Sequence, residues 1–133
     1  MWLDGLRIAL SPENLLWLFV GSAFGLFIGV LPAIGANLGV ALVLPFTFCM
    51  DPTSAIIMLC AIHAAANYGD SVASILLNTP GGPGTVATCW DGYPMAQKGQ
   101  GGRALGIATL GSFAGGVIGC VALITLARPL NDL

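Results

Sequence analysis

Charged residues are scarce in this 133-residue sequence, which has four Lys or Arg and six Asp or Glu, together 8% of the chain. A soluble domain usually carries about 25%. Two long stretches, one between Glu13 and Asp51 and one over residues 104–127, contain no charged residue. Because a water-facing surface needs ionisable side chains, the scarcity excludes an ordinary soluble domain and predicts an integral membrane protein.

Motifs of enzymes, metal sites and nucleic-acid binders are absent as well. The four cysteines are spaced singly and the chain has one histidine, which excludes a zinc site and a disulfide framework. The only lysine, Lys98, is followed by Gly99 rather than Ser or Thr, so the Walker phosphate loop is absent, and no serine has the nucleophile-elbow pattern. A net charge of −2 excludes a basic nucleic-acid footprint. We therefore expect no enzyme, no cofactor and no nucleic-acid partner.

The apolar stretches predict a single all-α membrane domain with about three to four transmembrane helices, some of them broken or re-entrant. Ser11-Pro12-Glu13 has the chemistry of a helix start, and Pro32 cannot continue a helix, which predicts a first span over 13–31. Asp51-Pro52 repeats the start signal before a predicted helix over 53–79. The last predicted span, 104–127, would be about 36 Å long, more than the hydrocarbon core of about 30 Å.

The segments between these helices are less regular. Residues 36–50 are apolar but short, so they form either a short span or a re-entrant piece. We favour the re-entrant form, because it places Arg7 and the segment 80–103 together on the cytoplasmic side, as the positive-inside tendency prefers. Residues 80–103 are rich in Gly and Pro, which predicts an aqueous or interfacial loop.

Polar residues interrupt the helix predicted over 53–79, between Asn67 and Ser71. We expect a distortion there, lined by protein or by a water-filled cavity, because unpaired backbone groups are costly in lipid. Asp70 is the one carboxylate inside this segment, and it faces either a cavity or the membrane interface. His63, seven residues earlier, is either a packing residue or part of a proton relay with Asp70.

Two sets of glycines recur every fourth residue, at 21, 25 and 29 and at 111, 115 and 119. Such spacing puts each set on one helix face, where the missing side chains let another helix approach closely. Both sets are interpreted as packing faces.

Three stretches resemble the large membrane subunit of the tripartite tricarboxylate transporters, the TctA family. The first is GVLPAIGANLGVALVLPFTF, the second contains LNTPG, DGYPMAQKGQ and GRALGIA, and the third is the glycine-striped last helix. The resemblance covers nearly the whole chain from Glu13 onward. It departs from the family at Ala33 and Asp70, where the family usually or commonly has glycine.

The resemblance implies the first part of a larger inverted-repeat transporter fold, multi-pass in the bacterial inner membrane. It also implies a small membrane subunit and a periplasmic solute-binding protein as partners, and a carboxylate as substrate. The chain would supply about the first quarter of such a subunit, so we interpret it as a fragment or a truncated reading frame.

The leading hypothesis is cation-coupled uptake of a tricarboxylate or related organic acid at the breaks 32–37 and 67–71. Broken helices offer free amides to a carboxylate and free carbonyls to a cation, with H⁺ or Na⁺ coupling left open. The candidate binding residues are Pro32, Gly35, Asn37, Asn67, Gly69, Asp70, Ser71, Ser74 and Asn78. The alternative is a non-transporting truncated remnant or a helix-packing module, which reading the downstream DNA would distinguish.

If Asp70 lies beside an anion site, its charge opposes a bound carboxylate by about 4 kcal/mol at about 4 Å and an effective dielectric near 20, unless a proton or cation neutralises it. Asp70→Gly should then change the affinity for the acid and the dependence of uptake on pH or sodium. Uptake assays in the complete transport system test this. Identical affinities and identical pH and sodium profiles would place Asp70 at the interface instead.

Overall fold

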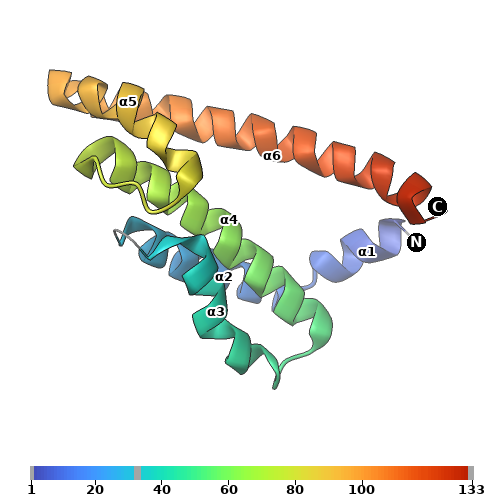
Figure 1. The fold of residues 1–133 in the computed structure, drawn as a ribbon. Helices are drawn as coiled ribbons and strands as arrows, with labels where there is room; N and C mark the ends of the chain where they lie inside the picture. The colour runs from blue at the N-terminus through green and yellow to red at the C-terminus, as the bar shows by residue number, and fades with distance from the viewer. Residues whose placement is uncertain (1, 32–33, 132–133) are drawn as a thin grey trace.

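The computed structural model describes residues 2–31 and 34–131, and all regular structure in these ranges is helical. The helices are α1 (Trp2–Ala9), α2 (Pro12–Val30), α3 (Gly35–Thr47), α4 (Pro52–Leu77), α5 (Val86–Met95) and α6 (Gly101–Asn131) (Figure 1). A 3₁₀ turn, Pro83–Thr85, precedes α5, and a wide helical turn, Ala96–Gln100, follows it. Three apolar helical stretches, Pro12–Val30, Pro52–Leu77 and Pro83–Leu126, are long enough to cross a membrane. The predicted all-α membrane class is confirmed.

The starts of α2 and α4 follow from local chemistry. The Ser11 hydroxyl accepts a hydrogen bond from the Asn14 amide at 3.5 Å, and the Asp51 carboxylate accepts one from the Thr53 amide at 3.0 Å. A proline fills the first turn of each helix, where no amide partner is needed. Both starts agree with the sequence expectation.

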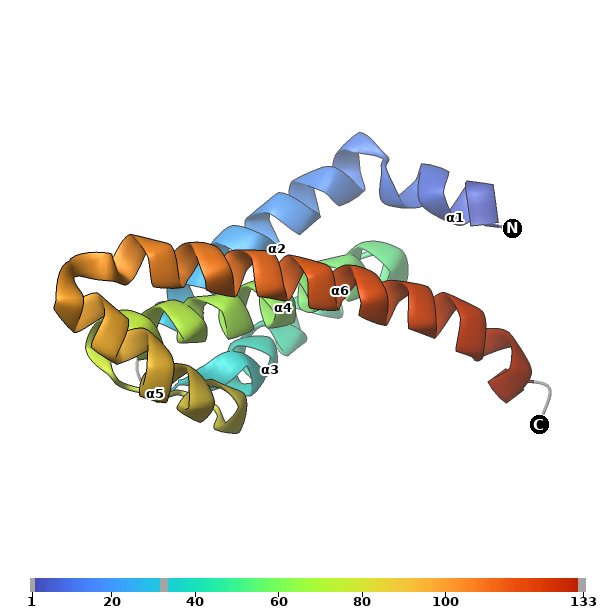
Figure 2. The ribbon, with the colours of Figure 1, turned by 90° about the horizontal axis from the view of Figure 1, so that it is seen from above.

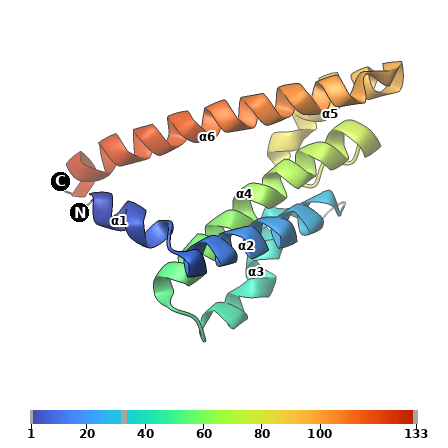
Figure 3. The ribbon, with the colours of Figure 1, turned by 180° about the vertical axis from the view of Figure 1, so that it is seen from behind.

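Helices α2 and α4 pack against each other in the same direction (Figures 1 and 3). The glycines of α2 lie against the backbone of α4 in the pairs Gly21 with Met58, Gly25 with Ile62 and Gly29 with Ala66. Both members of each pair advance by four residues, so the two helices are parallel. A Cβ on any of these glycines would collide with the facing backbone. The predicted packing role of this glycine set is confirmed.

A buried polar contact joins the starts of the two parallel helices. The Ser54 hydroxyl of α4 donates to the Asn14 side-chain oxygen of α2 at 2.7 Å, and both residues are buried. The Asn14 side-chain amide donates in turn to the Ile8 carbonyl of α1 at 2.7 Å. The contact therefore fixes the relative register of α2 and α4 and also holds α1 at that end.

The parallel arrangement decides the course of α3. Because α2 and α4 run the same way, the chain must return between them, and α3 carries it back from the end of α2 toward the start of α4 (Figure 3). The parallel arrangement therefore favours the short span over the re-entrant form for residues 36–50. Helix α3 has 13 residues and is therefore about 20 Å long.

The loop expected over 80–103 is largely helical instead. Pro83 stands in a first turn, where proline is tolerated, and Gly99 reverses the chain with a φ of 76°, which glycine adopts without strain. Helix α5 lies between the end of α4 and the start of α6, and α6 runs back antiparallel to α4 (Figure 2). The Tyr68 hydroxyl and the Thr109 hydroxyl, 2.8 Å apart, join α4 to α6.

The distortion expected between Asn67 and Ser71 is also wrong, because α4 is continuous through both residues. The Asn67 side-chain amide donates to the His63 carbonyl at 2.8 Å, and the Ser71 hydroxyl donates to the Asn67 carbonyl at 3.2 Å. Side chains that bond to the preceding turn satisfy themselves without breaking the backbone ladder. Polar residues within an apolar stretch are therefore not sufficient to predict a break in the helix.

The second glycine set, on α6, meets no partner within the described residues. A Cβ at Gly111, Gly115 or Gly119 would have no described atom within 4 Å. Large apolar side chains on the same helix are also exposed, among them Leu110, Phe113 and Ile118. The predicted packing role of this set is not fulfilled by the described part of the chain.

The glycine contacts predict a clear difference between the two sets. Gly25→Val should destabilise the chain by about 1–3 kcal/mol, because the added atoms would overlap the Ile62 backbone. Gly115→Val, which has open space around it, is the matched control. Thermal unfolding in lipid nanodiscs measures both, and equal melting temperatures for the two variants would contradict the parallel contact.

The parallel helices also predict membrane topology. A cysteine at Gly5 and one at Gln100 should lie on opposite sides, because α2 and α4 run the same way and Gln100 follows the reversal after α4. Exposed native cysteines are first replaced. An impermeant thiol reagent applied to intact cells should then label one position and not the other. Equal labelling of both would favour a re-entrant α3.

Candidate functional site

Two reversals of the chain meet at the same end of the α2 and α4 pair. The first lies between α2 and α3, where Gly35 is among its described residues, and the second is the segment 78–85 after α4. Gly35 has a φ of 64°, and a Cβ placed there would lie 3.3 Å from the Gly81 carbonyl oxygen. The two reversals are therefore neighbours in space, although more than forty residues separate Gly35 from Gly81.

The second reversal begins with a left-handed residue. Asn78 caps the end of α4 with a φ of 56° and a ψ of 33°, a conformation that asparagine tolerates better than most residues other than glycine. Its conformation ends the helix and turns the chain back toward α4. The capping role explains an asparagine at this position without a ligand.

Asp70 ties the returning segment to α4. Its side chain is 4% exposed, and its two oxygens accept from the Gly81 amide at 2.6 Å and from the Thr85 hydroxyl at 2.8 Å. The Thr85 hydroxyl also lies 2.9 Å from the Gly82 carbonyl oxygen. Asp70 is therefore bonded to the returning segment and not to His63, whose residue is exposed.

The structure brings only some of the predicted site residues together. Gly35 and Asp70 both contact Gly81, Gly35 at its carbonyl oxygen and Asp70 at its amide. Gly69 packs against α2, where a Cβ would lie 2.8 Å from the Leu26 carbonyl oxygen. Ser71 is half-buried, and three predicted residues are exposed, namely Asn37, Asn67 and Asn78. Pro32 lies outside the described residues.

Two buried hydroxyl groups near this reversal have no hydrogen-bond partner among the described residues. They belong to Ser74, which is fully buried one turn after Asp70, and to Thr79, which follows the Asn78 cap. An unpartnered buried hydroxyl costs about 1–3 kcal/mol, so such groups mark places where water or a ligand is accommodated. Ser74 thus remains a candidate, and Thr79 joins it.

Sequence reasoning missed Thr79, Gly81 and Thr85. The glycines around residue 81 invite comparison with a phosphate loop, which their spacing excludes. No local pattern indicates that Asp70 reaches a backbone amide 11 residues later and a hydroxyl 15 residues later. Only the direction of the chain after Asn78 brings these groups together.

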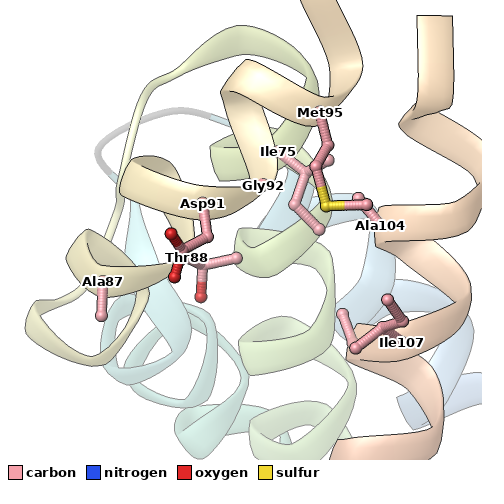
Figure 4. A pocket seen from close by; sticks show the side chains of 9 residues that line it. Ile75, Ala87, Thr88, Asp91, Gly92, Met95, Ala104 and Ile107 are labelled. Atoms are coloured by element: carbon pink, nitrogen blue, oxygen red, sulfur yellow. The ribbon is translucent and has the colours of Figure 1, made fainter. Parts of the chain in front are cut away.

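A separate open pocket of about 330 Å³ lies between α4, α5 and α6 (Figure 4). Its wall is mostly apolar, with Thr88 and Asp91 as its polar side chains, one turn apart on α5. It is lined by residues of α4, α5 and α6, namely Ile75, Ala87, Thr88, Asp91, Gly92, Met95, Ala104, Ile107 and Ala108. None of the predicted site residues contributes to it.

Comparison with known proteins identifies the family. Residues 15–133 match the model of the family described as Tripartite tricarboxylate transporter TctA family. The chain belongs to this family. The resemblance noted in the sequence is thereby confirmed, and the TctA family is a family of transporter membrane components rather than of enzymes.

One curated relative of this TctA-family chain is an uncharacterised 52.8 kDa protein in the TAR-I ttuC′ 3′ region of Agrobacterium vitis. It is 44% identical over 129 residues, which are 97% of this chain and 26% of the relative. The chain therefore spans about a quarter of the length of that protein. No solved structure matches.

Proposed function

We propose that this TctA-family chain is part of the membrane subunit of a secondary active transporter in the bacterial inner membrane. The transporter takes up tricarboxylates or related organic acids. It works with a small membrane subunit and with a periplasmic binding protein that delivers the acid. The two neighbouring reversals, which end at Gly35 and cover residues 78–85, form part of its substrate and ion site.

The observation that carries this proposal is the contact between the two reversals. Backbone outside regular helices offers amides and carbonyls to a ligand. The first reversal ends at the N-terminus of α3, where no side chain of the described residues caps the helix. The first amides of a helix have no partner inside the helix, so this end suits a carboxylate group.

Hydroxyl groups supply a second contribution. Ser74 and Thr79 have buried side-chain oxygens without partners among the described residues. Each can donate one hydrogen bond to a carboxylate and accept from water or a cation. Neutral donors suit an anion that must be released again, because they bind it less tightly than a fixed positive charge does.

The structure reduces the number of candidate residues for the site. Asn67 and Gly69 lie in a regular helix, and Gly69 is occupied by the contact with α2. The proposal therefore rests on Gly35, Ser74 and Thr79 rather than on a break at 67–71. The proposal includes uptake as the direction of transport and coupling to either H⁺ or Na⁺.

Gly35 provides the test. Gly35→Ala forces an L-residue into the left-handed region, which costs about 1–2 kcal/mol, and brings its Cβ against the Gly81 carbonyl oxygen. We expect the kcat/KM for uptake to fall about tenfold or more, with unchanged amounts of protein in the membrane. Uptake of labelled citrate and related acids, by cells that contain the complete transport system with this chain, measures it.

Gly106→Ala is the matched control, because Gly106 has open space around it and no positive φ. It should leave uptake unchanged. Normal uptake in the Gly35→Ala variant would exclude this reversal from the site. If the wild-type system concentrates no organic acid at all, a packing or assembly role becomes the better explanation.

A further inference from the structure

Asp70 is held by one segment of the chain through both of its carboxylate oxygens. Oδ1 accepts from the Gly81 amide at 2.6 Å and Oδ2 from the Thr85 hydroxyl at 2.8 Å. The carboxylate thus has two well-aligned partners on the returning segment.

The same segment closes over the carboxylate. A Cβ on Gly81 would lie 2.9 Å from Oδ1, and a Cβ on Gly82 would lie 3.2 Å from Oδ2. The two glycines therefore bring bare backbone close against the acid, where a side chain would not fit without a shift. Within the described residues, no group of three His, Cys, Asp or Glu side chains surrounds Asp70 that could hold a metal ion.

The geometry also tolerates the loss of the charge. An asparagine at position 70 keeps an oxygen that can accept from the Gly81 amide, and its amide group can donate to the Thr85 oxygen. The Thr85 hydroxyl can then donate to the Gly82 carbonyl, which already lies 2.9 Å away. Each bond of the contact thus has a neutral counterpart.

The contact positions more than the loop itself. Gly81 bonds to Asp70 through its amide, while its carbonyl oxygen faces Gly35 in the α2–α3 reversal. Loss of the Asp70 contact would therefore release the 78–85 segment from α4 and change what lies beside Gly35. Asp70 acts at a distance on the proposed substrate site.

We propose that Asp70 is a positioning residue, whose carboxylate fixes segment 78–85 on α4 and sets the position of Gly81 beside Gly35. Its hydrogen-bonding geometry, and not its negative charge, is what it contributes. The consequence for transport rests on the proposed function. The effect on the segment itself does not, so the two can be tested apart.

The first experiment measures hydrogen exchange of residues 78–86 in the full chain in lipid nanodiscs. Asp70→Ala should speed exchange by about ten- to a hundredfold, and Thr85→Val by less, because it removes only one of the two bonds to Asp70. Asp70→Asn should stay within about threefold of wild type, because its bonds are replaced. Asp91→Asn, a carboxylate on α5 outside this contact, is the matched control and should change nothing.

Asp70→Asn decides between geometry and charge. Exchange as fast as in Asp70→Ala would overturn the proposal, and so would unchanged exchange in Asp70→Ala. If the alanine variant does not fold, the comparison of Asp70→Asn, expected close to wild type, with Thr85→Val, expected to exchange faster, still tests the positioning role.

The second experiment measures uptake of labelled citrate by the complete transport system. Asp70→Asn should keep the wild-type KM and the wild-type dependence on pH and sodium, whereas Asp70→Ala should raise KM about tenfold or more. A changed cation dependence in Asp70→Asn would show that the charge is required and would overturn the proposal. A wild-type system without uptake contradicts the proposed function, and the exchange comparison then decides the role of Asp70.

Discussion

The close parallel contact between α2 and α4 is the constraint on which the rest of the structure depends. Three glycines of α2 lie against the α4 backbone, so the two helices approach as closely as backbones can. In lipid, association of this kind relies on close packing, because no hydrophobic force drives apolar helices together. A larger side chain at these positions would separate the helices along their shared length.

Parallel packing has a topological consequence. Two parallel helices that follow each other in the chain need a connection that returns to the starting end, and α3 is that connection. The reversals after α2 and after α4 then lie at the same end of the pair, where Gly35 meets Gly81. The two irregular segments of the proposed site thus lie together because α2 and α4 run in the same direction.

The same architecture explains why polar side chains are tolerated within the apolar helices. Asn67 and Ser71 bond to their own helix, Asn14 and Ser54 bond to each other, and Asp70 bonds to the returning segment. Many apolar side chains stay exposed, for example Phe19 and Phe113 at more than 70%. Such a surface suits lipid, where apolar exposure is neutral and only unpaired polar groups are costly.

The sequence by itself determined the features that depend on neighbouring residues. The scarcity of charge gave the membrane class, the Ser-Pro and Asp-Pro pairs gave the starts of α2 and α4, and the spacing of Gly21, Gly25 and Gly29 gave the packing face. Each follows from local propensity or from the period of a helix. The sequence also indicated the irregular backbone at Gly35, because a proline and a glycine between two apolar stretches are typical of a break.

Only the tertiary structure decided the direction of α3, the helical course of 83–100 and the partners of Asp70. These depend on contacts between residues far apart in the chain, and no local pattern records which distant group a carboxylate will meet. The local sequence around a polar residue in an apolar stretch does not show whether that residue breaks the helix or bonds to a segment that folds back onto it. In this chain Asp70 does the second, because the turn at Asn78 brings Gly81 and Thr85 to it.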